Sequence, residues 1–210
     1  MKITIIGAGG NIGQRITKEA ASRNHDLKLI TSRNKDFFDL ENAKTQEVDI
    51  FNTENLANAI KGSDIVISAY NPPQGKEMLL SEASKSLISA AKQANVRLIA
   101  VGGAASLKVD EDTILLDTPE FPDVVKPIAS AHKIVLDEVY RKEKELEWTN
   151  VSPSAKIFEG ERTNSFRVGG NHLLTDEKGD SSISMEDFAV GILNEVDNKE
   201  FIKQRFTIGY

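Results

Sequence analysis

Close to its beginning the chain carries the stretch Ile3-Thr4-Ile5-Ile6-Gly7-Ala8-Gly9-Gly10-Asn11-Ile12-Gly13, which decides the fold. Its first four residues are β-branched and mostly apolar, as is typical of a strand buried on both faces of a parallel sheet. Glycines follow at once, and Ile12, Ile16 and Ala20 then recur at helical spacing. The pattern predicts that the chain passes from a strand through a tight turn into a helix.

The three glycines of this turn that are spaced three residues apart have separate expected roles. Gly7 permits the turn, Gly10 lets the backbone approach a phosphate, and Gly13 lets the helix pack closely on the strand. The first free N–H groups of the helix, together with its dipole, attract a pyrophosphate. We therefore expect a dinucleotide here, whereas the alternative is a tight turn that binds nothing. The residues expected to contact the cofactor are Gly7, Ala8, Gly10, Asn11, Ile12 and Gly13.

The composition limits the fold and the range of partners. The 210 residues carry a formal net charge of −6, and 40% of them are hydrophobic. The acidic balance disfavours nucleic-acid binding, and no apolar run approaches the ~20 residues that a membrane span needs. Cysteine is absent, and no histidine pair has metal-ligand spacing, so we expect no metal.

The arrangement of the chain predicts a single unit. Because no charged and apolar leader precedes the first strand, we expect a cytoplasmic protein. No linker, internal repeat or low-complexity segment divides the sequence, so we expect one domain over residues 1–210. Its C-terminal part, from about residue 153, is expected to elaborate the substrate side. The oligomeric state is left open.

Alternating strands and helices define the expected fold class. Strands are predicted at 3–6, 27–31, 48–51, 64–69, 96–101 and 147–153, and helices at 55–60, 76–94 and 128–143. A hairpin over 166–175, a helix that begins after Ser184 and a last strand at 205–208 follow them. Six strands that alternate with helices predict an α/β protein with a Rossmann-type doubly wound parallel sheet and a small C-terminal elaboration.

The residues after the second strand decide which dinucleotide is expected. An acid in this region hydrogen-bonds the adenine ribose of NAD, whereas an arginine accepts the 2′-phosphate of NADP. No acid lies between Leu27 and Lys35, and Arg33 stands where the strand ends, between Ser32 and Asn34. We therefore expect NADP(H) to be preferred over NAD(H). The alternative is a solvated loop arginine.

Further cofactor contacts are expected at the carboxyl ends of the next strands, where cofactors lie in such sheets. Asp49 at the end of the third strand can accept from the adenine amino group, with Ile50 packed on the base, although Asp49 can equally be a turn or helix cap. The corresponding positions after the fourth and fifth strands are Ala69, Tyr70, Gly102 and Gly103.

Three side chains are candidates for a catalytic role beside the substrate: Tyr70, Ser106 and His132. Ser106 follows the glycines of the fifth strand, near the expected nicotinamide. His132 titrates near neutrality and lies on the helix that faces this edge. The alternatives are a loop serine and a helix-surface histidine. The irregular, proline-containing stretch 107–127 is typical of a surface loop that can wall a substrate pocket.

Several motifs along the chain resemble those of one protein family. They are the stretches 7–13, 32–34, 64–69, 101–107, 117–122, 148–153, 160–163 and 183–187. On these residues the chain resembles atypical short-chain dehydrogenases/reductases of the NAD(P)H-binding, NmrA-like group. It is most similar to the bacterial proteins labelled NADH-flavin reductases, and more distantly to flavin/biliverdin-IXβ reductase. The resemblance spans essentially the whole chain and implies the fold and the dinucleotide.

One departure from the short-chain dehydrogenases bears on the reaction. Their usual Tyr-x-x-x-Lys pair, in which tyrosine is the acid, has no tyrosine in the corresponding region 126–133. Tyr140 and Lys144 have the spacing but lie late on the helix in a charged run, so we expect them on the surface. Without that pair, carbonyl reduction of the usual kind lacks its proton donor.

Two classes of function remain open. Hydride transfer to a flavin or quinone asks less of the protein, because the acceptor ring stabilises the added charge itself. The sequence therefore favours an NAD(P)H-dependent reductase of a flavin, a quinone or a similar planar small molecule, with flavin as substrate and not as bound cofactor. The alternative is a non-catalytic NADP(H)-binding redox sensor of the NmrA type, which binds a partner.

Overall fold

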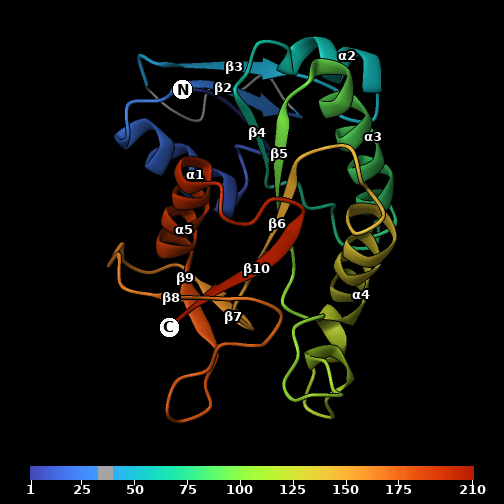
Figure 1. Cartoon of the computed structure of the whole chain (residues 1–210), viewed down its shortest axis with the longest axis vertical. Helices are drawn as coiled ribbons and strands as arrows, with labels where there is room; N and C mark the ends of the chain where they lie inside the picture. Colours follow the sequence, from blue (N-terminus) through green and yellow to red (C-terminus); the bar gives the residue numbers. More distant parts are fainter. Residues whose placement is uncertain (33–39) are drawn as a thin grey trace.

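The main sheet of the computed structural model, which describes residues 1–32 and 40–210, has eight strands. In sequence order they are β1 (Lys2–Ile6), β2 (Asp26–Thr31), β3 (Ala43–Glu47), β4 (Ile65–Ser68), β5 (Arg97–Val101), β6 (Trp148–Pro153), β8 (Arg167–Gly169) and β10 (Gln204–Gly209). Their spatial order is β3-β2-β1-β4-β5-β6-β10-β8 (Figure 1). Every neighbouring pair is parallel except β10 and β8. A second, parallel sheet joins β7 (Lys156–Phe158) to β9 (Ser182–Ser184).

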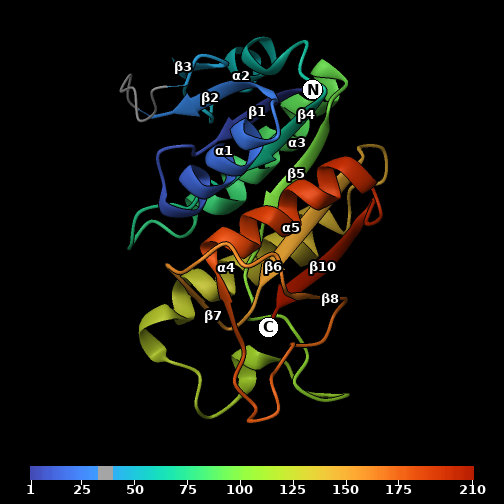
Figure 2. The same cartoon turned by 90° about the vertical axis from the view of Figure 1, so that its left-hand side faces the viewer.

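Helices cover both faces of the main sheet. They are α1 (Asn11–Ser22), α2 (Thr53–Ile60), α3 (Leu79–Ala94), α4 (Lys126–Val135) and α5 (Met185–Asn198), with the 3₁₀ turns η1 (Leu115–Asp117) and η2 (Asp123–Val125) and the π-helical turn η3 (Leu136–Tyr140). Helices α1 and α5 pack together on one face, and α2, α3 and α4 lie on the other (Figure 2). The predicted Rossmann-type α/β fold is confirmed.

Strand β1 lies at the centre of the sheet because its side chains are apolar on both faces. Ile3 and Ile5 belong to the core beneath α1 and α5, whereas Ile6 belongs to the core beneath α2, α3 and α4. All three are at most 1% exposed. Thr4, the polar residue between them, bonds the Ser63 hydroxyl at 2.7 Å, so its buried oxygen is satisfied.

The predicted third strand was placed wrongly. The strand is Ala43–Glu47, and the apolar run at 48–51 forms the turn that follows it. Strand β3 is the edge of the sheet and is mostly exposed, so its residues after Ala43 are polar and form no apolar run. Val48 and Ile50 are apolar for another reason, because they pack into the core beneath α2 and α3.

The predicted hairpin over 166–175 is also wrong. Strand β8 pairs antiparallel with β10, and His172 forms an isolated bridge with Lys108 instead of with β8. The helix after Ser184 is as expected, since the Ser184 hydroxyl accepts from the backbone N–H of Asp187. The last strand, β10, lies between β6 and β8, so part of the C-terminal elaboration completes the main sheet.

A buried ion pair fixes α5 against the sheet. Arg97 of β5 and Glu195 of α5 bond each other, with side chains that are 5% and 2% exposed. Glu195 also accepts from the Thr149 hydroxyl and from the backbone N–H of Phe201. Because removing one partner of such a pair leaves a buried charge, this contact restrains the position of α5. Within residues 1–32 and 40–210, no helix has the length and hydropathy of a membrane span.

Candidate functional site

A cleft of about 1510 Å³ runs along the carboxyl ends of the parallel strands. It follows the ends of β1, β2, β3, β4, β5 and β6, at Gly7, Thr31, Glu47, Ala69, Val101 and Pro153. Small-molecule pockets are typically ~300–1,000 Å³, so this cleft has room for a dinucleotide and a second molecule. The strand order reverses between β1 and β4, which is where ligands bind in open α/β sheets.

The glycine turn has the geometry that its sequence predicts. Gly7 has a φ of +76°, which L-residues rarely adopt, and its backbone N–H bonds Ile30 O at 3.0 Å. A β-carbon on Gly13 would lie 2.1 Å from Gly7 O, so α1 can approach the turn only with glycine there. By contrast, a β-carbon on Gly10 would meet nothing closer than 3.4 Å. Gly10 is therefore not needed for packing within the protein, and it lines the cleft.

Helix α1, like α3 and α4, begins without a side-chain cap, whereas α2 and α5 have one. Its N-cap is Gly10, which offers no side chain, and its first turn holds no acidic residue. Helix α2 is capped by Asn52, and α5 is capped by Ser184 and carries two acids in its first turn. The N-terminus of α1 thus keeps its positive dipole end and N–H groups for an anion from outside, as a pyrophosphate site requires.

The expected adenosine end of the cleft is lined by residues from the ends of β2 and β3. Ser32, Asp49 and Ile50 all line the cleft, as does Glu47. The Asp49 carboxylate accepts from the Phe51 backbone N–H at 3.0 Å, so it caps its own turn as the alternative interpretation held. Arg33 and Asn34, on which the expected preference for NADP rests, lie outside the described residues.

The expected nicotinamide edge brings together the ends of β4 and β5. Ala69, Tyr70, Gly102 and Gly103 line the cleft, together with Ile12 and Asn11 of α1. The ring of Tyr70 meets the ring of Phe51 edge-on, with centroids 6.1 Å apart. Burial raises the pKa of Tyr70, and Glu82 adds to the shift. Ala8 and Gly13 do not line the cleft; they lie behind the turn, where Ala8 is fully buried.

His132 of α4 lies at the same edge. Its Nε2 atom is 3.2 Å from Oδ1 of Asn71, and it lines the cleft. The ring is packed against Gly103, where a β-carbon would meet Cβ of His132 at 3.0 Å. Burial lowers the pKa of His132 to about 4, so the imidazole is neutral at pH 7. A neutral ring beside the Asn71 carbonyl donates from Nε2, which leaves Nδ1 as the acceptor.

Ser106 does not share this edge, since it is not among the described residues that line the cleft. Its hydroxyl and carbonyl oxygens accept from Arg205 at 3.4 Å. Arg205 is buried and also donates to Asn171 at 2.8 and 2.9 Å. The structure therefore does not place Ser106 beside the expected nicotinamide, where a catalytic role was predicted for it. The hydroxyl turns away to bind Arg205, and neighbouring Ala104 and Ala105 line the cleft in its place.

The expectation that Tyr140 lies on the surface is wrong. Tyr140 is 2% exposed and its ring packs on Trp148 at 5.6 Å between centroids. Burial raises the pKa of Tyr140 to about 12. Lys144 remains exposed and donates to Arg141 O, so it does not face the phenol. Tyr140 and Lys144 therefore do not form a catalytic tyrosine–lysine pair at the edge of the cleft.

The far end of the cleft, which we call the acceptor end, was largely missed by the sequence patterns. Its lining is mostly apolar and comes from two stretches of the chain. The apolar residues are Leu115, Phe121, Pro122, Val125, Ile128, Ala129, Ile157 and Met185, and the polar ones are Thr118, Glu120 and Lys156. The first stretch includes part of the loop 107–127, which was expected to wall a pocket and does so. The second, at 155–157 and 185, had no signal because β7 is too short for a periodic pattern.

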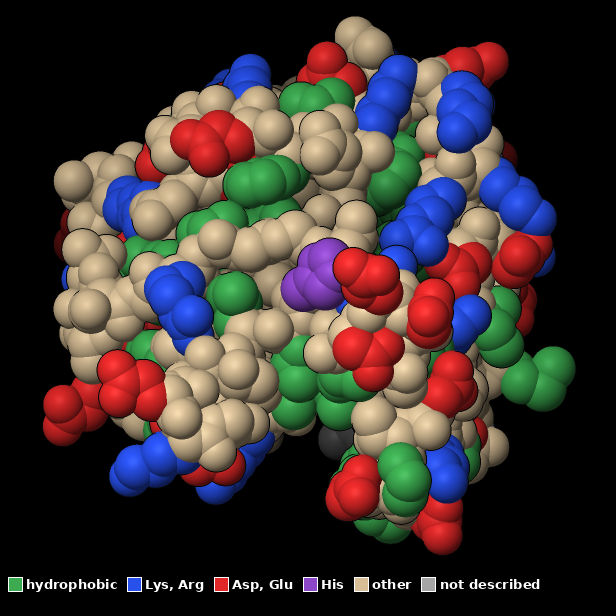
Figure 3. Space-filling view, turned by 60° about the horizontal axis from the view of Figure 1, so that its bottom comes forward, with side chains coloured by type: hydrophobic (Ala, Val, Ile, Leu, Met, Phe, Trp, Pro, Cys, Tyr) green, Lys and Arg blue, Asp and Glu red, His purple; other side chains and the backbone are tan. Residues whose placement is uncertain are grey.

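The surface agrees with this description. Viewed from the end of the molecule where the loops after β5 gather, hydrophobic side chains lie in a hollow between charged ones (Figure 3). In the described part of the chain, no group of three or more histidine, aspartate or glutamate side chains is arranged to hold a metal ion.

Comparison with known proteins identifies the family. A sequence profile of a family described as NAD(P)H-binding matches residues 7–199. The chain belongs to this NAD(P)H-binding family. The match begins at the first glycine of the turn and includes both walls of the cleft.

Individual relatives share the whole length of the chain. YwnB of Bacillus subtilis, described as uncharacterized, is 40% identical, and the match covers 99% of this chain and 98% of YwnB. A crystal structure described as a candidate NADH-flavin reductase from Streptococcus pneumoniae is 34% identical, with a TM-score of 0.87 and coverage of 100% and 99%. A candidate epimerase from Bacteroides thetaiotaomicron is 32% identical, with a TM-score of 0.94 and coverage of 100% and 96%. The fold is common to these proteins, whereas the named activities differ.

Proposed function

We propose that this protein is an NADPH-dependent reductase that transfers a hydride to a planar acceptor such as a flavin or a quinone. The observation that carries the proposal is the continuity of the cleft. It leads from the uncapped start of α1, past His132, to an end lined mostly by apolar side chains. The candidate flavin reductase among the relatives supports this assignment.

The residues of the cleft fit a dinucleotide in three respects. The start of α1 offers N–H groups to the pyrophosphate, and Gly10 lets those groups approach it. The turn at Asp49 and Ile50 lines the cleft where the adenine is expected. When bound there, the reduced nicotinamide supplies a hydride, which bonds to the acceptor while the acceptor takes one proton from water and NADP⁺ remains.

The protein's part in this reaction is to bind, orient and exclude water. Apolar Phe121, Ile157 and Met185 remove water from one side of the acceptor. His132 is neutral and fixed by Asn71, so it orients a ring by hydrogen bonding and does not deliver a proton as imidazolium. Such chemistry needs no tyrosine acid, because the reduced flavin or quinone holds the added charge itself.

The preference for NADP(H) over NAD(H) is a separate proposal. It rests on the sequence at the end of β2, where Arg33 follows Ser32 and no acid is present. A guanidinium can form a charge-assisted hydrogen bond to the 2′-phosphate, which NAD lacks. Its test is given in the Discussion.

The test of the reductase is multiple-turnover oxidation of NADPH, followed by loss of nicotinamide absorbance, with riboflavin, FMN and two quinones as acceptors. We expect turnover with at least one of them, and none with a Gly10→Val variant prepared in parallel, which controls for contaminating reductases. Undiminished dinucleotide binding without turnover on any acceptor would reject the reductase. That outcome would favour the alternative function, a non-catalytic NADP(H)-binding redox sensor that binds a partner.

A further inference from the structure

The segment 159–165, which we call the strap, lies in the connection between β7 and β8, contains no helix or strand, and contacts α1 and α5. Most of its residues are exposed. Despite that exposure, it is held by side chains from both helices. Its beginning is close in sequence to Lys156 and Ile157, which line the acceptor end of the cleft.

Arg15, in the second turn of α1, holds the beginning of the strap. Its Nη2 atom pairs with Glu159 at 2.7 Å, and its Nε atom pairs with Glu186 at 2.9 Å. The second oxygen of Glu186 accepts from the backbone N–H of Gly160 at 2.9 Å. The Arg15 and Glu186 side chains are 16% and 21% exposed, so solvent screens their contact less than it screens surface pairs, whereas Glu159 is 80% exposed and its contact with Arg15 is screened more strongly.

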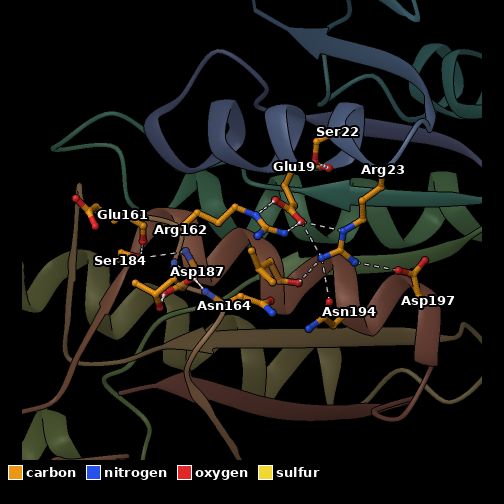
Figure 4. Close-up of polar contacts among 12 residues, drawn as sticks. Glu19, Ser22, Arg23, Glu161, Arg162, Asn164, Ser184, Asp187, Asn194 and Asp197 are labelled. Carbon is orange, nitrogen blue, oxygen red and sulfur yellow. Dashed lines mark hydrogen bonds and ion pairs between the residues drawn. The ribbon is translucent and has the colours of Figure 1, made fainter.

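One helical turn further along, Glu19 of α1 holds the middle of the strap. Its carboxylate is 6% exposed and accepts from Arg162 at 2.8 and 3.0 Å in the fork geometry that favours arginine (Figure 4). The two guanidinium groups of Arg162 and Arg23 flank this carboxylate and lower the pKa of Glu19. The strap is therefore fixed to α1 at two successive turns.

Helix α5 holds the strap from the other side. Asp187, which is fully buried, accepts from the backbone N–H groups of Thr163 and Asn164 at 2.9 and 2.8 Å (Figure 4). Met185, two residues earlier, lines the acceptor end of the cleft. Glu186, which lies between these two, is the residue that Arg15 binds. The contacts of Arg15 therefore lie next in sequence to both parts of the second stretch of the acceptor wall, 155–157 and 185.

These contacts connect the two ends of the cleft through one helix. Asn11 and Ile12, in the first turn of α1, line the cofactor end, and Arg15 lies about one turn beyond them. We propose that Arg15 is a positioning residue, which couples the cofactor-binding helix to the wall of the acceptor end. This inference rests on the proposed function for the identity of the acceptor, but the coupling itself is a property of the fold.

Coupling has a reciprocal consequence. If a dinucleotide fixes the start of α1, it also fixes Glu159, Glu186 and the wall beside them. By linkage, an acceptor seated against that wall then favours the dinucleotide by the same factor. Loss of Arg15 should therefore weaken acceptor binding to the dinucleotide-bound protein, while the affinity for the dinucleotide alone, measured without acceptor, stays nearly unchanged.

The experiment compares Arg15→Gln with Arg23→Gln as a matched control. Arg23 also joins α1 to α5, through Asp197 and Asn194 at 2.9 Å each, at the end of α1 away from the cleft. It pairs with Glu19, whereas Arg15 pairs with Glu159 and Glu186. Both substitutions remove one guanidinium from the same helix pair, so a general loosening of α1 affects both. Arg15→Lys is the conservative variant, because an ammonium can reach one carboxylate but not hold two in a fork.

We expect the KM for the acceptor to rise about tenfold in Arg15→Gln, the scale of a typical coupling free energy, with kcat and the Kd for NADP⁺ changed less than about twofold. Arg15→Lys should fall between this variant and the wild type, and Arg23→Gln should match the wild type. An unchanged KM in Arg15→Gln, or an equal rise in Arg23→Gln, would overturn the proposal.

A second readout does not depend on turnover. Hydrogen–deuterium exchange over residues 156–161 should slow when NADP⁺ is added to the wild type and to Arg23→Gln, but not to Arg15→Gln. Equal slowing in all three, or no slowing in the wild type, would refute the coupling. If no acceptor is reduced, the proposed reductase fails while this measurement still decides the role of Arg15.

Discussion

A β-carbon placed on Gly13 would lie 2.1 Å from the carbonyl oxygen of Gly7 and 3.0 Å from Cα of Ala8. Both atoms belong to backbone, so neither can swing away as a flexible side chain would. The close approach of α1 to the turn therefore depends on the missing side chain of Gly13.

The first prediction follows from that distance. Gly13→Ala should lower the free energy of unfolding by at least ~1–3 kcal/mol, the usual cost of overpacking a well-packed site. Urea denaturation followed by circular dichroism measures the change. A midpoint equal to that of the wild type would mean that α1 can shift without cost, which would contradict the packing role of Gly13.

Gly10→Val should have the opposite effect, because it should leave stability nearly unchanged and weaken NADPH binding. The φ of Gly10 is −77° and a β-carbon added to it would have its nearest neighbour at 3.4 Å, so a side chain there meets little of the protein. It would instead fill the space in front of the N–H groups of α1. We expect an unfolding midpoint close to the wild type and a loss of NADPH affinity of at least about tenfold, measured by titration calorimetry. Retained affinity in this folded variant would place the pyrophosphate elsewhere.

Arg33→Ala tests the preference between the two dinucleotides. A charge-assisted hydrogen bond is worth ~1.5–3 kcal/mol, so the substitution should weaken NADP⁺ about ten- to a hundredfold and leave NAD⁺ nearly unchanged. Dissociation constants for both cofactors and both proteins give the answer. If the substitution weakens NADP⁺ and NAD⁺ binding equally, or if the wild type binds both with equal affinity, Arg33 is an ordinary loop residue.

His132 predicts a dependence of stability on pH. Its folded pKa of about 4 lies below the ordinary value of 6.5, so the unfolded chain takes up a proton first as the pH falls. Stability is therefore lost as the pH drops from about 6.5 toward 4, and the loss attributable to this group at pH 5 is about 2 kcal/mol.

The measurement compares unfolding free energies at pH 7.5 and pH 5.0 for the wild type and His132→Gln. Glutamine cannot take up the proton, so the variant should lose about 2 kcal/mol less than the wild type over this interval. His25, whose pKa is also lowered by burial, is common to both proteins and cancels. Identical pH dependence in the two proteins would show that His132 titrates alike in the folded and unfolded states.

Sequence patterns predicted the fold well where the burial of an element fixes which of its residues are apolar. Strands β1 and β4 are buried on both faces and were recognised from their apolar runs, and Ser184 indicated the start of α5. Strand β3 was misplaced because an exposed edge strand needs no apolar residues. The direction of β8 could not be predicted either, since its partner, β10, lies more than thirty residues away in the sequence.

The candidate site was predictable at its cofactor end and not at its acceptor end. Gly7, Gly10 and Gly13 have a local pattern because backbone conformation and helix packing are decided within a few residues. Ser106 follows a glycine pair in the way a site residue does, but its hydroxyl is taken by Arg205, about a hundred residues away, which no local pattern reveals. Ile157 and Met185 meet at the cleft only through tertiary contacts.

The division of the cleft between separate stretches of chain has an evolutionary consequence. The cofactor end is built from residues before 52, together with the ends of β4 and β5, whereas the acceptor end comes from 115–129 and 153–185. Mutations in 115–129 and 153–185 can change which acceptor binds, while the residues of the cofactor end stay unchanged. A lineage with this layout can diversify its chemistry by exchanging one wall, which accords with the different activities named for relatives of nearly identical fold.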